Sequence, residues 1–281
     1  MKKNYKCHGS LVSKKLLKDK EDDVLQELYR RYEFWSHESS HLNSEIISEL
    51  HTKVDLLNDY KNFVDKLTNE DKYFRMQDKM SSSVIEEFLF YLFKDIPSIK
   101  SSIKEGLIYL GATNAYTDLS FAPKNIRDFI EQPNVFINYK NQDFTISKLI
   151  KCTFECNSNV DYKEIVVPTV SIECKTFIPS TMLGQSIYEA QLLKQGNPFA
   201  LYIIVAETNA LSDNINLRNN YIDEIFILRK QKRNSKKNKV SDKKPLDYLV
   251  IKDLYDFVKE YLNKEWFNNK KATEKGRLIR L

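Results

Sequence analysis

An acid and a lysine two residues apart, Glu173 and Lys175, have the residue types and the spacing to carry out chemistry. They end an apolar, β-branched run, which predicts a strand from Val167 to Pro179. Because side chains along a strand alternate between its faces, the acid and the lysine point the same way, and the apolar residues at the alternate positions can face a core. A carboxylate can bind a hard divalent cation, and a lysine can steer or activate a water. Together they suit metal-assisted hydrolysis of a phosphodiester.

The same pair is open to a simpler interpretation, an ion pair on an edge strand. The residues that follow favour the chemical one. Met182 to Lys194 carries apolar residues at helical spacing, and Phe199 to Ala206 is a compact apolar run typical of a buried strand. Strand, helix and strand in this order predict a right-handed crossover in an α/β sheet.

The composition indicates a globular chain. It has 281 residues, of which 42% are hydrophobic, enough to bury a sizeable core. The longest apolar run, Phe199 to Ala206, is far below the roughly 18 residues of a membrane span, and no apolar run follows the positive charges at the N-terminus. Four cysteines at irregular spacing do not indicate a disulfide framework. We therefore expect a soluble, cytoplasmic protein with no membrane partner.

Positive charge is concentrated in one polar segment. The formal net charge is +5, and Arg229 to Lys244 alone carries nine Lys or Arg and one Asp. Such a run predicts either a solvated loop or a loop that contacts phosphates. The candidate DNA contacts are Lys230, Lys232, Arg233, Lys236 and Lys237.

The first third of the chain has the apolar spacing of helices. The pattern predicts helices within Leu16 to Trp35, Ile46 to Leu57 and Asp59 to Leu67. We therefore expect an N-terminal helical region over residues 1–80 and a core over residues 81–281 that carries the basic loop 229–244.

His37-Glu38-Ser39-Ser40-His41 matches the His-Glu-x-x-His pattern of zinc peptidases, in which two histidines bind zinc and the glutamate is the base. Two adjacent serines are unfavourable inside a helix, and no third histidine or glycine turn follows. Solvated histidines near the start of a helix are the preferred interpretation, and a zinc peptidase remains a remote alternative.

Two adjacent glutamates lie in the next predicted helix, Val84 to Phe93, which Ser81 to Ser83 can cap. At about 100° per residue, Glu86 borders the apolar face and Glu87 falls on the opposite side. We expect Glu86 to reach the site and Glu87 to face solvent. The alternative for Glu86 is a surface salt bridge.

Strand signals follow this helix. Gly106 to Leu110, a turn over residues 111–114 and Tyr116 to Phe121 predict a hairpin, with Asp118 in its second strand. Aspartate is depleted from strands, so Asp118 is a candidate for function. Further strands are expected at Val135 to Tyr139 and Leu149 to Glu155.

Glu86 on a helix, Asp118 in a strand, and Glu173-Cys174-Lys175 ahead of a crossover helix resemble the PD-(D/E)xK nuclease superfamily. Three segments resemble, more closely, type II restriction endonucleases of the two-subunit BbvCI type. They are Ser83 to Leu89, Thr117 to Phe121 and Ser171 to Thr176. The likeness runs over most of the chain, including the helical N-terminal part.

The resemblance implies a mixed central sheet flanked by helices and a Mg²⁺-dependent cleavage of double-stranded DNA that leaves 5′-phosphates. It implies that Asp118, Glu173 and the carbonyl of Cys174 hold the metal and that Lys175 positions the attacking water. The helix geometry adds Glu86, which can take part in the shell of the metal or of the water. One site cuts one strand, so a double-strand break implies a homodimer or a heterodimer with a related subunit. Asp161 is the alternative first metal ligand, although its surroundings are turn-like.

Two other functions remain open at this point. A repair or junction-resolving nuclease with the same core would prefer DNA structure to DNA sequence. A DNA-binding protein without activity would use Glu173 and Lys175 only as an ion pair, and added Mg²⁺ would not produce cleavage.

Overall fold

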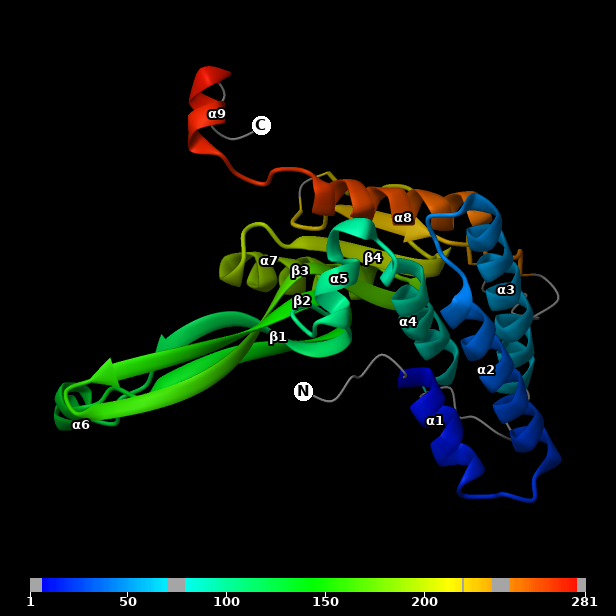
Figure 1. The fold of residues 1–281 in the computed structure, drawn as a ribbon, viewed down its shortest axis with the longest axis horizontal. Coiled ribbons are helices and arrows are strands. Elements are labelled where there is room, and N and C mark those ends of the chain that lie inside the picture. Colours follow the sequence, from blue (N-terminus) through cyan, green and yellow to red (C-terminus); the bar gives the residue numbers. More distant parts are fainter. Residues whose placement is uncertain (1–6, 70–78, 219, 234–242, 277–281) are drawn as a thin grey trace.

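The computed structural model describes residues 7–69, 79–218, 220–233 and 243–276 (Figure 1). The helices are α1 (Cys7–Leu16), α2 (Asp23–His41), α3 (Ile47–Asn69), α4 (Met80–Phe93), α5 (Pro97–Lys104), α6 (Ile126–Glu131), α7 (Ser180–Gly196), α8 (Tyr248–Asn263) and α9 (Asn269–Glu274). The strands are β1 (Tyr109–Phe121), β2 (Val135–Cys156), β3 (Asn159–Ile178), β4 (Leu201–Asn209) and β5 (Glu224–Ile227). None of the described helices is both long enough and apolar enough to cross a membrane.

The five strands form one mixed sheet in the order β1-β2-β3-β4-β5. The first three strands pair antiparallel, and β3, β4 and β5 pair parallel. Helix α7 connects β3 to β4, so the predicted strand, helix and strand unit is confirmed. The sheet flanked by helices and the helical N-terminal region are confirmed as well.

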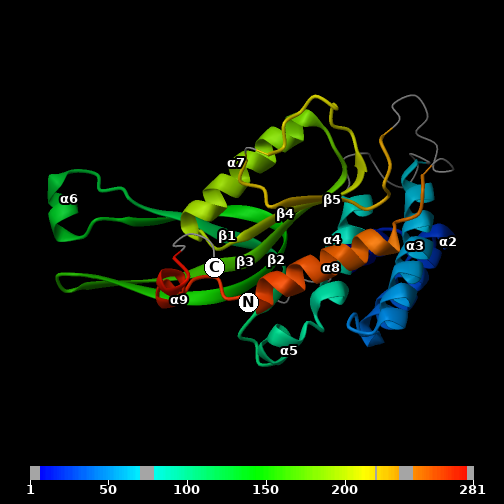
Figure 2. The ribbon, with the colours of Figure 1, turned by 90° about the horizontal axis from the view of Figure 1, so that it is seen from above.

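The sheet separates two apolar cores. Val170, Ile172 and Cys174 of β3 join the larger core, to which α2, α3, α4 and α8 contribute. Tyr202 and Ile204 of β4 face the smaller core under α7. Figure 2 shows α7 on one side of the sheet and α4, α8 and the N-terminal helices on the other. The alternation expected for the strand that carries Glu173 is therefore observed.

Strand β2 bends back on itself. Its first part pairs with β1 and its second part with β3, and both parts run to the same end of the molecule. Asn157, in the turn between β2 and β3, donates hydrogen bonds to the carbonyls of Ile130 and Glu131, at the end of α6. Two prongs thus project from the body, one tipped by α6 and one by the β2–β3 turn (Figure 2). We call these two prongs together the arm, residues 116–140 and 149–165.

Several predicted boundaries differ from the structure. Residues 109–121 form one strand, β1, so the predicted hairpin of Gly106 to Leu110 and Tyr116 to Phe121 is wrong. A register shift between Gly111 and Thr113 accommodates the predicted turn residues without a reversal of the chain. The predicted second and third helices are one helix, α3. Ser81 to Ser83 lie inside α4 and do not precede it.

The prediction that Glu87 faces solvent is wrong. Its side chain is fully buried and accepts hydrogen bonds from the Gly9 N–H (3.0 Å), the Tyr32 hydroxyl (2.9 Å) and the Tyr91 hydroxyl (2.8 Å). Helix α4 packs on the sheet on one side and on α1 and α3 on the other, so it has no solvent face at this position. A polar residue opposite the apolar stripe then needs hydrogen-bond donors, which α1, α2 and α4 supply.

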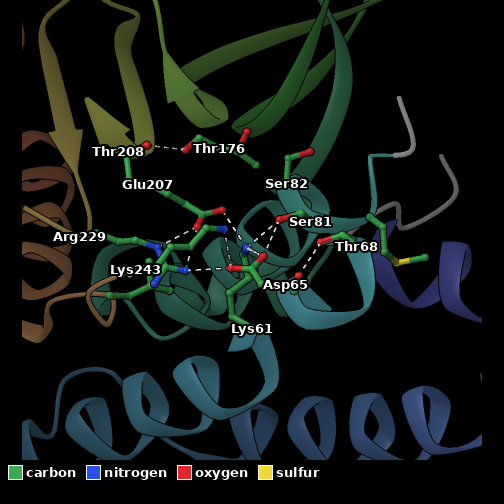
Figure 3. Close-up of polar contacts among 12 residues, drawn as sticks. Lys61, Asp65, Thr68, Ser81, Ser82, Thr176, Glu207, Thr208, Arg229 and Lys243 are labelled. Carbon is green, nitrogen blue, oxygen red and sulfur yellow. Dashed lines mark hydrogen bonds and ion pairs between the residues drawn. The ribbon is translucent and has the colours of Figure 1, made fainter. Parts of the chain in front are cut away.

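A buried ion network joins the helical region to the sheet (Figure 3). Lys61 of α3 contacts Glu207 of β4 at 2.8 Å and also pairs with Asp65. Arg229, which follows β5, contacts Glu207 at 2.9 Å and Asp65 at 3.2 Å, and Lys243 contacts Asp65 at 2.9 Å. The prediction that Arg229 belongs to a basic surface loop is therefore wrong, since its side chain is fully buried among acids.

Candidate active site

The candidate site lies where β2 and β3 separate. Phe144 and Ile172 are the last paired residues of β2 and β3, and among the described residues β3 pairs beyond Ile172 with β4 alone. Asp143, just before Phe144, is therefore at the bend of β2 and beside the free edge of β3. The Cys174 N–H donates a hydrogen bond to Asp143 Oδ2 at 3.0 Å. At this unpaired edge of β3, a carboxylate thus takes the place of a neighbouring strand as the hydrogen-bond acceptor.

Glu173 and Lys175 point the same way, as expected. Lys175 Nζ lies 2.7 Å from Glu173 Oε1, and the Tyr202 hydroxyl donates to Glu173 Oε2 at 2.9 Å. Glu173 is buried and the Lys175 side chain is 27% exposed. Burial alone would lower the pKa of Lys175, but the charge of Glu173 and its hydrogen bond outweigh burial and raise the pKa above 10.5. The lysine is therefore a cation, and it cannot act as a base in this state.

Glu86 approaches the site from α4, on the side of the sheet opposite α7. It is buried, and burial followed by the charge of Asp143 raises its pKa from 4.5 to about 7. The charge of Lys175 acts on Glu86 in the opposite direction. The structure thus brings Glu86 into the electrostatic field of the site, and its carboxyl group can hold a proton near neutral pH.

A second lysine approaches Asp143 from solvent. Lys79 Nζ lies 3.2 Å from Asp143 Oδ1, and its side chain is 67% exposed, whereas that of Asp143 is 16% exposed. Each of the two carboxylates at the separation of the strands, Asp143 and Glu173, therefore has one lysine as its partner.

The donor atoms suit a hard divalent cation. Asp143 and Glu173 offer carboxylate oxygens, and Cys174, which directly follows Glu173 and whose N–H binds Asp143, offers a backbone carbonyl. Mg²⁺ is commonly bound through one or two carboxylates together with waters and phosphate oxygens. Among the described residues, no group of three or more His, Cys, Asp and Glu side chains could hold a metal ion, so an enclosed site built from protein ligands is not found there. The two carboxylates fit the open type of site.

The structure does not bring Asp118 to Glu173. Asp118 is exposed on the arm, where it pairs with Asn138 and accepts a hydrogen bond from the N–H of Leu119 at 2.7 Å. Asn138 is five residues from Asp143, about 17 Å along a strand. Asp118 was selected because aspartate is unusual in a strand, but the register carries this aspartate out along the arm.

Asp161 is also remote. The turn-like segment that contains it forms a turn only at residues 157–158. It lies in β3, pairs across to Phe154 and forms an ion pair of 2.8 Å with Lys163. Twelve residues of strand, roughly 40 Å, separate it from Glu173. Asn157, in that turn, has a positive φ of 55°.

Sequence reasoning missed Asp143. It is the only acid between the two predicted strands Val135 to Tyr139 and Leu149 to Glu155, and it precedes Glu173 by 30 residues. This isolated acid among strand residues was the available signal.

Three of the five candidate DNA contacts are already engaged with other groups. Lys230 pairs with Asp247 at 3.0 Å and Lys232 with Asp213 at 2.6 Å. The Arg233 guanidinium lies 3.5 Å from the centre of the Phe177 ring, two residues beyond Lys175. Lys236 and Lys237 lie outside the described residues.

The His-Glu-x-x-His segment ends α2; it does not start a helix. Both histidines are exposed, with ring centres 4.4 Å apart, and the His37 ring bonds to Glu38, the next residue. The glutamate therefore lies beside the first histidine, with both side chains in solvent.

Comparison with known proteins identifies the class. The model of the Bpu10I restriction endonuclease family matches residues 77–278. The chain therefore belongs to this family, and it is a type II site-specific deoxyribonuclease. No curated protein matches the sequence.

A solved structure shares the fold. It is described as the native BbvCI A2B2 tetramer, and it superposes with a TM-score of 0.70 at 18% sequence identity over 92% of this chain and 96% of that chain. The N-terminal helices are thus part of the shared architecture.

Proposed function

We propose that the chain cleaves double-stranded DNA with Mg²⁺ held by Asp143, Glu173 and the carbonyl of Cys174, and that cleavage leaves 5′-phosphates. The observation that carries this proposal is the position of Asp143. The bend of β2 brings its carboxylate to the edge of β3, directly beside the Glu173-Cys174-Lys175 segment. Asp143 thereby takes the role that the sequence assigned to Asp118.

The protein groups have distinct roles in this proposal. A bound Mg²⁺ would lower the pKa of a coordinated water and neutralise charge that develops on the phosphate. Lys175, held as a cation by Glu173, orients the attacking water and stabilises the phosphate oxygens. Tyr202 fixes Glu173 by donating to its second oxygen, and this leaves the Glu173 side chain little rotational freedom. Glu86, with its raised pKa, exchanges a proton at the edge of the site.

A double-strand break requires two such sites, so we infer a second subunit. The structure named for BbvCI is a tetramer of two kinds of subunit. In this chain the arm is the best candidate for contact with another subunit. Large apolar side chains are exposed on α6, and Ile126, Phe129 and Ile130 follow one another at helical spacing with 72%, 54% and 65% of their surfaces exposed.

Charge favours protein over DNA as the partner of the arm tip. Helix α6 and Lys124, just before it, together carry two cations and two acids. Arg127 pairs with Glu131 at 2.9 Å. A DNA contact would call for a net positive charge. An apolar stripe bordered by balanced charges suits a surface of the same kind on another subunit.

The experiment is cleavage of plasmid DNA by the purified chain with and without Mg²⁺, followed by run-off sequencing of the products. We expect cuts at one sequence, with 5′-phosphate ends that DNA ligase accepts. Lys175→Ala should abolish cleavage. Lys163→Ala is its matched control, because Lys163 forms the same acid-x-Lys ion pair on the same strand, outside the site.

Cleavage that follows DNA structure and ignores sequence would contradict site specificity. Cleavage that survives in EDTA, or equal loss in the two lysine variants, would contradict the role given to this site.

A further inference from the structure

Lys79 approaches the site differently from Lys175. Lys175 belongs to the catalytic strand and pairs with Glu173 next to it, in a half-buried position. Lys79 directly precedes α4, and its ammonium contacts Asp143 Oδ1 at 3.2 Å while most of its side chain lies in solvent. It is therefore held at its tip by one carboxylate and can leave that carboxylate without disrupting a packed core.

Asp143 has two different polar partners. Oδ2 accepts a hydrogen bond from the Cys174 N–H, which fixes the carboxylate against β3. Oδ1 accepts one from the ammonium of Lys79. A metal ion that binds Asp143 from the open side competes for Oδ1, because this oxygen is the one not committed to the backbone. The ammonium and a divalent ion also repel each other at such short range.

We propose that Lys79 is a resident counter-ion, which neutralises Asp143 while no metal is bound and transfers to a phosphate oxygen of the DNA when a metal binds. A lysine suits this exchange because it is a compact cation with three donors on a flexible stem. The inference rests on the function proposed for Asp143. It assigns to this chain a phosphate-binding residue that lies outside the Glu173-Cys174-Lys175 segment.

The proposal predicts opposite changes in two measurements. Removing the ammonium by Lys79→Met should tighten metal binding on the order of tenfold, because one competing unit charge is lost. The same change should weaken DNA binding and reduce its salt slope by about one, because one phosphate contact is lost. Damage to the fold would instead weaken both.

The experiment measures Ca²⁺ binding to the whole chain by calorimetry, with Ca²⁺ alone and no DNA, and then DNA binding in Ca²⁺ at several salt concentrations. Lys79→Arg keeps the charge and should behave like the unaltered chain in both. Lys100→Met is the matched control, because Lys100 is also partly exposed and contacts a largely buried acid, Asp95, at 3.0 Å away from the site. It should change neither measurement.

Unchanged or weaker Ca²⁺ binding by Lys79→Met, including binding too weak to detect in both proteins, would overturn the proposal. An unchanged salt slope would overturn the phosphate contact. Failure of the unaltered chain to cleave DNA in Mg²⁺ would instead refute the proposed function. The calorimetric result for Lys79→Met would still show whether Lys79 competes with a metal ion for Asp143.

Discussion

Arg229→Met should destabilise the protein far more than Lys243→Met, although both remove a cation from the same buried network. The Arg229 side chain is fully buried and contacts Glu207 at 2.9 Å, Asp65 at 3.2 Å and the carbonyl of Lys244. Methionine fills most of the volume without the charge, so Asp65 of α3 and Glu207 of β4 lose one of the cations that they share, while Lys61 still contacts both (Figure 3).

The expected magnitude follows from burial. Breaking a buried ion pair by removing one partner costs about 3–5 kcal/mol, because the remaining charge stays buried. The Lys243 side chain is 35% exposed, so water screens its contact with Asp65, and its loss should cost about 1 kcal/mol or less. The two cations left after Arg229→Met, Lys61 and Lys243, still balance the two acids, which argues for the lower end of the range for Arg229.

Urea unfolding followed by circular dichroism gives the two free energies of unfolding. A second variant, Glu207→Gln, should also be costly, and it should lower the additional cost of Arg229→Met because the two residues contact each other. Equal costs for Arg229→Met and Lys243→Met would refute the reasoning, since they would mean that burial does not distinguish the two cations.

Three further predictions concern the site and the arm. Glu86→Gln should stabilise the metal-free protein at pH 8 by up to about 3 kcal/mol and much less at pH 5. The pKa of Glu86 is about 7 in the folded protein and 4.5 in the unfolded chain, so the folded state loses stability as the pH rises from 4.5 through 7, and glutamine removes this loss. Urea unfolding in EDTA at both pH values tests this, and an equal effect at both would contradict it. Tyr202→Phe should lower the single-turnover cleavage rate about tenfold with DNA binding unchanged, because Glu173 loses the donor that fixes it; an unaltered rate would show that Lys175 alone holds Glu173. Phe129→Asp should lower the mass found by light scattering. Leu249→Asp, at a somewhat more exposed apolar position on α8, should not, and the same mass for both variants would show that the arm is not in the subunit interface.

The strand, helix and strand around Glu173 could be predicted because its signals are local. Alternation along β3 and the helical period of α7 are readable in short windows, and the geometry of a strand places Glu173 and Lys175 on one face. No contact from a distant part of the chain is needed for these conclusions.

Asp143 could not be selected in the same way because its role depends on a bend. The residues on either side of it read as two short strands, and only the pairing of β2 with both β1 and β3 brings its carboxylate to Cys174. Asp118 had the stronger local signal, but the register of β1 with β2 directs it along the arm.

The burial of charged side chains was the other feature that could not be predicted from the sequence. A pattern of polar and apolar residues assigns Glu87 and Arg229 to the surface, because single charges are rarely buried. Each is buried with partners from elsewhere in the chain, including Tyr32 for Glu87 and Asp65 for Arg229. Such partners are separated by 55 and 164 residues, so no local window contains both.

The most direct test of the proposed site is the Mg²⁺-dependent cleavage rate of Asp143→Asn measured beside that of Asp118→Asn. We predict a loss of at least about a hundredfold for Asp143→Asn, because the proposed metal ligand is removed, and a change within about twofold for Asp118→Asn, which alters only an exposed position on the arm. Full loss in Asp118→Asn with a near-normal rate in Asp143→Asn would contradict the assignment.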